Sequence, residues 1–141
     1  MTFKKIFLNV TAILILCKTP LALAANETTK PAEVIYSESR LNIVVEKKNP
    51  IFRIRLKSNP TTGYSWFLRE YDHDLLVPVK HEFESPTMTV VGAPGSDVWT
   101  FKVKPTGFTV PQQSTLRMVY ARPWQGADGS TQIVFRVSIV K

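Results

Sequence analysis

Few residues of this 141-residue sequence could support catalysis: Asp72-His73-Asp74 forms one cluster, and His81 is the only other histidine. A carboxylate beside an imidazole is a partnership used in acid–base chemistry and in metal binding. The members of a catalytic triad come together in space, however, whereas neighbours on a polar turn point apart. No zinc-binding helix motif, glycine-rich phosphate loop or nucleophile elbow is present. We therefore expect no enzymatic activity, no metal and no cofactor, and interpret both histidines as ordinary surface residues.

A stiff polar turn, Asn59-Pro60-Thr61-Thr62-Gly63-Tyr64, is better suited to binding. Pro60 fixes its own φ and keeps Asn59 out of the helical region, while Gly63 permits a positive φ. Asn59 can also bond locally to backbone. Thr61 and Thr62 are then presented with little conformational freedom left to lose on binding. An ordinary turn without a binding role is the alternative, because turn chemistry of this kind is common.

A second candidate binding segment is Arg122-Pro123-Trp124. Arginine and tryptophan dominate binding hot spots, since each offers a large contact area with directional groups. The alternative is that Trp124 folds back into the core and Arg122 is solvated.

A third candidate segment is Gly92-Ala93-Pro94-Gly95, inside a connection expected from Ser85 to Asp97. Connections of this length are unusual in a compact domain, which marks this one as functional or mobile.

The rest of the chain alternates apolar and polar residues with the period of half-buried strands. The clearest case is 51–57, where Phe52, Ile54 and Leu56 alternate with basic residues. Further strands are expected near 41–46 and 115–121, and at 64–69, 98–104 and 131–140, with one or two short strands in 75–83 interrupted by Pro78. Trp66 and Trp99 stand at inward positions and are assigned to the core.

This pattern predicts an all-β fold, an immunoglobulin-like β-sandwich of seven to eight strands with Greek-key connections. The only cysteine is Cys17, so the fold has no disulfide. If consecutive strands run antiparallel, the connections around 59–63, 85–97 and 122–130 lie at the same end of the sandwich. The three candidate segments would then lie side by side on loops held by a rigid scaffold.

The N-terminus predicts export. Lys4 and Lys5 precede an apolar run, and Ala22-Leu23-Ala24 supplies small residues for signal peptidase. We expect a signal peptide at 1–24, a flexible leader at 25–33 and one domain at 34–141, with the protein in the periplasm or secreted. Lipidation of Cys17 is a weaker alternative, because Leu16 is not small.

Removal of residues 1–24 takes away three lysines and no acid, which leaves 15 basic and 11 acidic residues and a formal charge of +4. No Lys/Arg-rich run occurs, so we expect no nucleic-acid partner. The apolar run near the N-terminus is too short for a membrane span. A monomer is expected.

With these segments in view, the chain resembles the chagasin family of cysteine peptidase inhibitors. Asn59 to Tyr64 followed by Trp66, and Tyr120 with Arg122-Pro123-Trp124, are similar to two of its sequence motifs. Gly92-Ala93-Pro94-Gly95 corresponds to a third, glycine-rich motif, but Pro94 stands where a glycine is usual. Pro94 lacks an N–H, so it cannot donate a backbone hydrogen bond to a target at that position.

The resemblance implies a reversible, tight-binding inhibitor of papain-like peptidases, the family that includes papain and cathepsin L-like enzymes. Three loops would form a wedge that enters the peptidase cleft. Thr61 and Thr62 would lie over the catalytic cysteine and histidine, Trp124 would pack on the primed side with Arg122 nearby, and Gly92 to Gly95 would flank the other side. A secreted immunoglobulin-like module for adhesion or carbohydrate binding, with Trp124 as a stacking platform, is the alternative.

Overall fold

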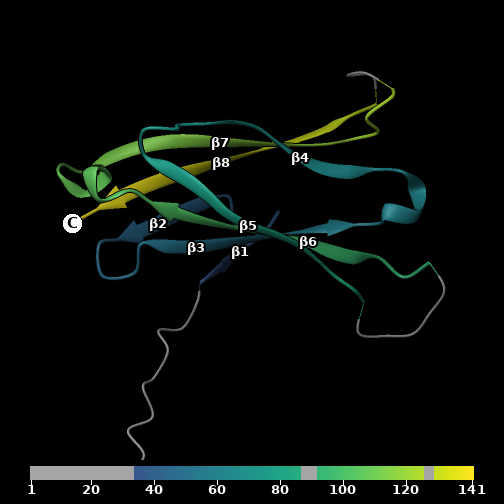
Figure 1. Cartoon of the computed structure of the whole chain (residues 1–141), viewed down its shortest axis with the longest axis horizontal. Coiled ribbons are helices and arrows are strands. Elements are labelled where there is room, and N and C mark those ends of the chain that lie inside the picture. The colour runs from purple at the N-terminus through teal and green to yellow at the C-terminus, as the bar shows by residue number, and fades with distance from the viewer. Residues whose placement is uncertain (1–33, 87–91, 126–128) are drawn as a thin grey trace, which may run out of the picture.

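The computed structural model describes residues 34–86, 92–125 and 129–141. The expected signal peptide and leader lie outside the described residues. Two four-stranded sheets pack face to face (Figure 1). The first has the order β1 (Ile35–Tyr36), β3 (Ile51–Ser58), β6 (Gly95–Val103), β5 (Leu76–Glu84), and the second the order β2 (Asn42–Glu46), β8 (Thr131–Val140), β7 (Gln112–Ala121), β4 (Ser65–Tyr71). The all-β sandwich is confirmed, and the Greek-key detail stays a prediction.

Two short 3-10 helices, η1 (Pro60–Thr62) and η2 (Pro105–Phe108), complete the described elements. Strand β1 pairs with β3 and strand β2 with β8 in parallel, and the other pairs are antiparallel. No helix in the described part of the chain is long and apolar enough to span a membrane.

The core lies between the sheets and follows the period-two pattern. In β3 the inward residues Phe52, Ile54 and Leu56 are buried, and Phe52 stacks on Phe101 of β6 at 5.4 Å between ring centroids. The second sheet contributes a matching set of fully buried side chains from three strands: Ile43, Leu116, Met118, Phe135, Val137 and Ile139. Burial of apolar surface on this scale is the main favourable contribution to folding. This core holds the connections between strands in fixed positions.

The expected interruption at Pro78 is wrong. Strand β5 runs continuously through it, with a register shift between Pro78 and Lys80 against β6. Strand β5 is at the edge of its sheet, where proline is tolerated because no neighbouring strand needs its missing N–H. The bulge therefore absorbs the proline instead of ending the strand.

The expected burial of the two tryptophans is confirmed for Trp66 and only partly for Trp99. Trp66 is buried, whereas Trp99 packs against the core but remains partly exposed. The imidazole of His81 stacks on Trp99 at 4.0 Å, and its Nε2 lies 2.8 Å from Oδ1 of the buried Asp97. His81 is exposed, so its interpretation as a surface residue is confirmed, but its ring contact with Trp99 and its bond to Asp97 also fix it at the edge of the sandwich.

The outer face of the first sheet carries an ionic network. Arg53 binds Glu82 and Arg55 binds Glu84, each at 2.8 Å, and Lys80 binds Glu82 at 2.5 Å. The hydrogen bond from Lys80 is the main cause that lowers the pKa of Glu82 below its ordinary value of 4.5. This network joins β3 to β5 across β6.

Candidate functional site

The Asn59 turn is one turn of 3-10 helix with both ends fixed. Asn59 has φ −129° and ψ 87°, outside the helical region, as expected before Pro60. Gly63 closes the turn with φ 78°, and its N–H donates to the Pro60 carbonyl at 3.0 Å. The positive φ predicted for Gly63 is confirmed, and the tip of this loop has little backbone freedom left.

Both threonine hydroxyls donate within the loop. Thr61 Oγ1 donates to Asn59 Oδ1, and Thr62 Oγ1 donates to the Asn59 carbonyl, each at 2.6 Å. The Asn59 side chain thus bonds a neighbouring side chain, not the backbone that its residue type suggested. Thr61 and Thr62 remain exposed, and a hydroxyl oxygen that donates its hydrogen can still accept one.

The connection from β7 to β8 holds this tip from the side. Arg122 Nε donates to the Thr62 carbonyl at 3.1 Å, and the guanidinium carbon lies 4.6 Å from the centre of the Tyr64 ring. The indole of Trp124 lies against Gly63, where an added Cβ would approach ring atom Cη2 to 2.8 Å. Two loops about sixty residues apart in sequence therefore form one surface.

Trp124 is 70% exposed, which decides between the two predictions for it. It lies at the surface and does not fold back into the core. A large exposed indole held on a proline-stiffened loop is a typical anchor for a partner protein.

An aromatic base supports the two loops from below. The Asn59 N–H donates to the Tyr120 hydroxyl at 3.0 Å, and the Tyr120 ring stacks on Tyr64 at 5.2 Å. Trp66 packs on the Tyr120 ring at 4.9 Å, and its Nε1 donates to the Lys57 carbonyl at 2.8 Å. Tyr120 is thus the link between the strands and the turn. The sequence marked Tyr120 only as part of the motif that it shares with Arg122-Pro123-Trp124 and gave no sign of the Asn59 bond.

The glycine-rich segment lies in the connection from β5 to β6, and residues 87–91 of this connection lie outside the described residues. Gly92 has a positive φ of 83° with open space around its Cα. Gly95 already belongs to β6, where it pairs with Ser58 and is buried under the Phe83 ring. The connection thus ends at Pro94, earlier than the expected Asp97, so of the four residues of the segment Gly92, Ala93 and Pro94 lie outside the strand.

The three connections lie at one end of the sandwich, as the alternation of strand direction predicted (Figure 1). We call this the loop end. The β3–β4 turn is in the middle, the β7–β8 connection is beside it above the second sheet, and the β5–β6 connection is on the side of the first sheet. Which of these residues contact a partner stays a prediction.

The loop end presents exposed side chains, among them Thr61, Thr62 and Trp124. Among the described residues no group of three or more histidine, aspartate or glutamate side chains could hold a metal ion. Asp72, His73 and Asp74 lie in a turn after β4, where Asp72 Oδ1 accepts from the Asp74 N–H at 2.9 Å and His73 packs on the Tyr71 ring.

Comparison with known proteins agrees with this arrangement. Residues 46–139 match the model of the chagasin family of peptidase inhibitors. Chagasin of Trypanosoma cruzi is 29% identical over 86 residues, which cover 58% of this chain and 74% of that protein.

Solved structures show the same fold. The cysteine protease inhibitor EhICP2 of Entamoeba histolytica has a TM-score of 0.62 at 22% identity, covering 78% of this chain and 99% of that one. PbICP-C, solved in complex with falcipain-2, has a TM-score of 0.55 at 15% identity, covering 74% and 88%. The family match spans most of the domain and includes all three motif-bearing loops. This chain belongs to the chagasin family of peptidase inhibitors and is not an enzyme.

Proposed function

We propose that this chain is a reversible, tight-binding inhibitor of papain-like cysteine peptidases, which it blocks by inserting the loop end into the active-site cleft. Family membership supports inhibition, and the complex of PbICP-C with falcipain-2 supports this class of target. The proposed contacts are Asn59 to Tyr64 in the centre, Arg122 to Trp124 on one side and Gly92 to Pro94 on the other. Gly95 supports the third loop from within β6.

The observation that carries the proposal is the contact of Arg122 and Trp124 with the Thr62–Gly63 tip. Because the tip is held by its own turn, by Arg122 and by Tyr120, docking would order few additional groups. A preformed surface loses little conformational entropy on binding and therefore reaches high affinity from an interface of ordinary size, about 1,600 Å² in total.

The same contacts give a reason for resistance to cleavage. Hydrolysis of the Thr61–Thr62 bond would have to release the Thr62 nitrogen, whose N–H donates to the Asn59 carbonyl at 3.1 Å. The Thr62 carbonyl is held by Arg122 at 3.1 Å. A peptide bond fixed in a compact turn is kept from the alignment that nucleophilic attack requires.

Pro94 weakens the third contact, because it offers no N–H to a target. In this chain the proposed third loop would therefore contribute shape more than backbone hydrogen bonds. The central turn and the Arg122–Trp124 segment would provide most of the affinity.

We propose that the inhibitor acts after export, to the periplasm or the medium, which the pattern of residues 1–24 supports. N-terminal sequencing of the protein recovered outside the cytoplasm should begin at Ala25. An intact Met1 there would refute this part of the proposal.

The decisive experiment titrates the protein against papain and a cathepsin L-like peptidase at fixed substrate. Stoichiometric loss of activity, recovered on dilution, is the expected result. Full peptidase activity at micromolar inhibitor would sink the proposal. Binding to a polysaccharide array without inhibition would instead favour the adhesion or carbohydrate-binding alternative, for which the exposed Trp124 offers a stacking surface.

A further inference from the structure

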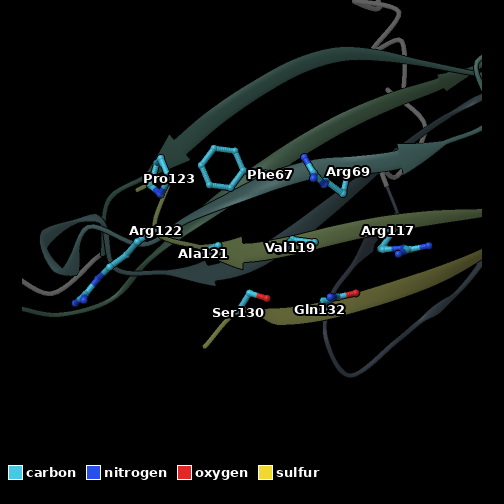
Figure 2. A pocket seen from close by; sticks show the side chains of 9 residues that line it. All are labelled: Phe67, Arg69, Arg117, Val119, Ala121, Arg122, Pro123, Ser130 and Gln132. Atoms are coloured by element: carbon cyan, nitrogen blue, oxygen red, sulfur yellow. The ribbon is translucent and has the colours of Figure 1, made fainter. Parts of the chain in front are cut away.

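A groove on the outer face of the second sheet adjoins the loop end. It has a volume of about 530 Å³ and is lined by residues of β4, β7 and β8 and of the connection after β7: Phe67, Arg69, Arg117, Val119, Ala121, Arg122, Pro123, Ser130 and Gln132. Figure 2 shows Val119 and Ala121 between Phe67 on one flank and Ser130 and Gln132 on the other. We call this the basic groove.

The floor of the basic groove is apolar although it faces outward. Phe67 is 39% exposed, and it pairs across the strands with Val119. Pro123, which precedes Trp124 in the chain, also lines the groove. Apolar side chains gathered in an outward-facing groove next to a proposed interface indicate a binding surface more often than isolated apolar residues do.

A β-bulge in the edge strand β4 shapes the wall of the groove. Leu68 pairs with Met118 and Glu70 with Arg117, so Arg69 is the extra, unpaired residue. Without the bulge, Glu70 would take the inward position. With it, Glu70 forms an ion pair with Arg117 on the outer face, and Arg69 lines the groove.

The charged side chains that line the groove are all positive. All three charged lining residues are arginines, and no lining residue is acidic. Arg117 is paired with Glu70, and Arg122 points away toward the Thr62 carbonyl. Among the described residues Arg69 has no hydrogen-bond or ion-pair partner, so its guanidinium is available to a carboxylate from outside.

We propose that the basic groove receives an acidic, extended segment of the target peptidase, beside the cleft and on the side of Trp124. This inference rests on the proposed inhibition. Pro123 lines the groove and precedes Trp124, so a peptidase in contact with Trp124 would bring its neighbouring surface over the groove. An aspartate or glutamate of this segment would form a bidentate ion pair with Arg69. The alternate side chains of the segment would pack on Phe67 and Val119.

The first test addresses the groove directly, without a peptidase. Backbone amide shifts of the protein would be followed by NMR during titration with the peptide Asp-Val-Asp-Val-Asp-Val and with its neutral counterpart Asn-Val-Asn-Val-Asn-Val. Shifts at Phe67, Arg69 and Gln132 with the acidic peptide alone are expected. No shift with either peptide, or shifts only with an anionic polysaccharide such as polygalacturonate, would overturn the inference.

The second test measures inhibition of papain or of the cathepsin L-like peptidase, whichever the wild-type protein inhibits more tightly. Arg69→Glu is expected to weaken inhibition about tenfold through slower association, with a smaller effect at high salt. The matched control is Arg136→Glu, which makes the same charge change on the same outer face but lies outside the groove, in β8 beside Thr115. Equal effects of the two variants would overturn the peptidase contact.

The two tests separate the possible failures. If the wild-type protein does not inhibit papain-like peptidases, the proposed function fails, and with it the peptidase as occupant. The peptide titration still decides in that case whether the groove binds acidic segments. If inhibition holds and the peptide titration is silent, only the inference about the groove is wrong.

Discussion

Arg122 is the side chain through which the two best-defined loops contact each other. Its Nε holds the Thr62 carbonyl, and its guanidinium covers the Tyr64 ring. Lysine keeps the charge but loses the planar donor and the flat stacking surface. We expect Arg122→Lys to weaken inhibition by about 1 kcal/mol, the size of one hydrogen bond.

The matched control for Arg122 is Arg40→Lys. Arg40 also lies over a tyrosine ring, that of Tyr36, at 4.8 Å, but it belongs to none of the three proposed binding loops. Inhibition constants and thermal unfolding of both variants would be compared. If Arg122→Lys inhibits as well as Arg40→Lys does, Arg122 does not position the tip.

Trp124 is exposed, so its removal tests binding without disturbing the core. Trp124→Ala should weaken inhibition by more than about 1 kcal/mol, as truncation of an interface anchor does, and leave the melting temperature nearly unchanged. Val110→Ala is the control, because Val110 is an apolar residue that is 57% exposed in the connection after η2. Unchanged affinity of Trp124→Ala would remove this residue from the interface.

Residue types identified these candidates, but their contacts could not be predicted from the sequence. Trp124 follows Pro123 in a segment without periodicity, so nothing in the pattern separates a surface position from a core position. Arg122 and Thr62 are sixty residues apart, and their bond depends on how the two sheets meet. The same holds for His81 and Asp97, which only the pairing of β5 with β6 brings together.

At the scale of the element, the β3–β4 turn depends on Gly63 in two ways. Its φ of 78° disfavours any side chain, and its Cα has the Trp124 ring as a neighbour. Gly63→Ala should therefore lower stability by about 1 kcal/mol for the backbone and weaken inhibition further by displacing Trp124. Thermal unfolding and inhibition would be measured together.

Gly129→Ala separates these two effects. Gly129 has a similar φ of 74°, but the nearest atom to an added Cβ is the Tyr64 hydroxyl at 4.0 Å. It should show the backbone effect alone. Equal inhibition by the two variants would mean that Trp124 does not need its place against Gly63.

The ionic network across β3, β6 and β5 predicts a pH dependence. Because the pKa of Glu82 is lowered in the folded state, its contribution is complete above its ordinary value of 4.5 and is lost as the pH falls through the lower folded value. The melting temperature should therefore fall less steeply below pH 4.5 in Glu82→Gln than in the wild type. Parallel curves would show that the pair with Lys80 adds nothing to stability, as is common for exposed ion pairs.

Alternation predicted the strands well where one face is buried. The expected strand 131–140 coincides with β8, and 51–57 is one residue shorter than β3. Prediction failed at two places: the edge strand β5 passes through Pro78 by a bulge, and Gly95 joins β6 because Ser58 pairs with it. A second bulge, at Arg69, could not be inferred, because a period-two pattern does not show an inserted residue.

At the scale of the whole molecule, the alternating direction of consecutive strands was enough to predict that the three connections lie at one end of the sandwich. No knowledge of side-chain contacts was needed. In the proposed function the sandwich is a rigid support, and the binding residues lie in the connections that it presents. The basic groove extends this surface from the tips onto one flank of the second sheet. A target would then meet the protein at an end and along part of one side.

The C-terminus lies at the end of the sandwich opposite to the loops, because β8 starts at the loop end and runs away from it (Figure 1). A tag fused after Lys141 would therefore hold the molecule by its far end. Protein immobilised in this way would display its loops to the mobile phase, as an affinity matrix for capturing peptidases from crude extracts. The same separation would let the three connections be exchanged as a library while the anchoring end stays unchanged.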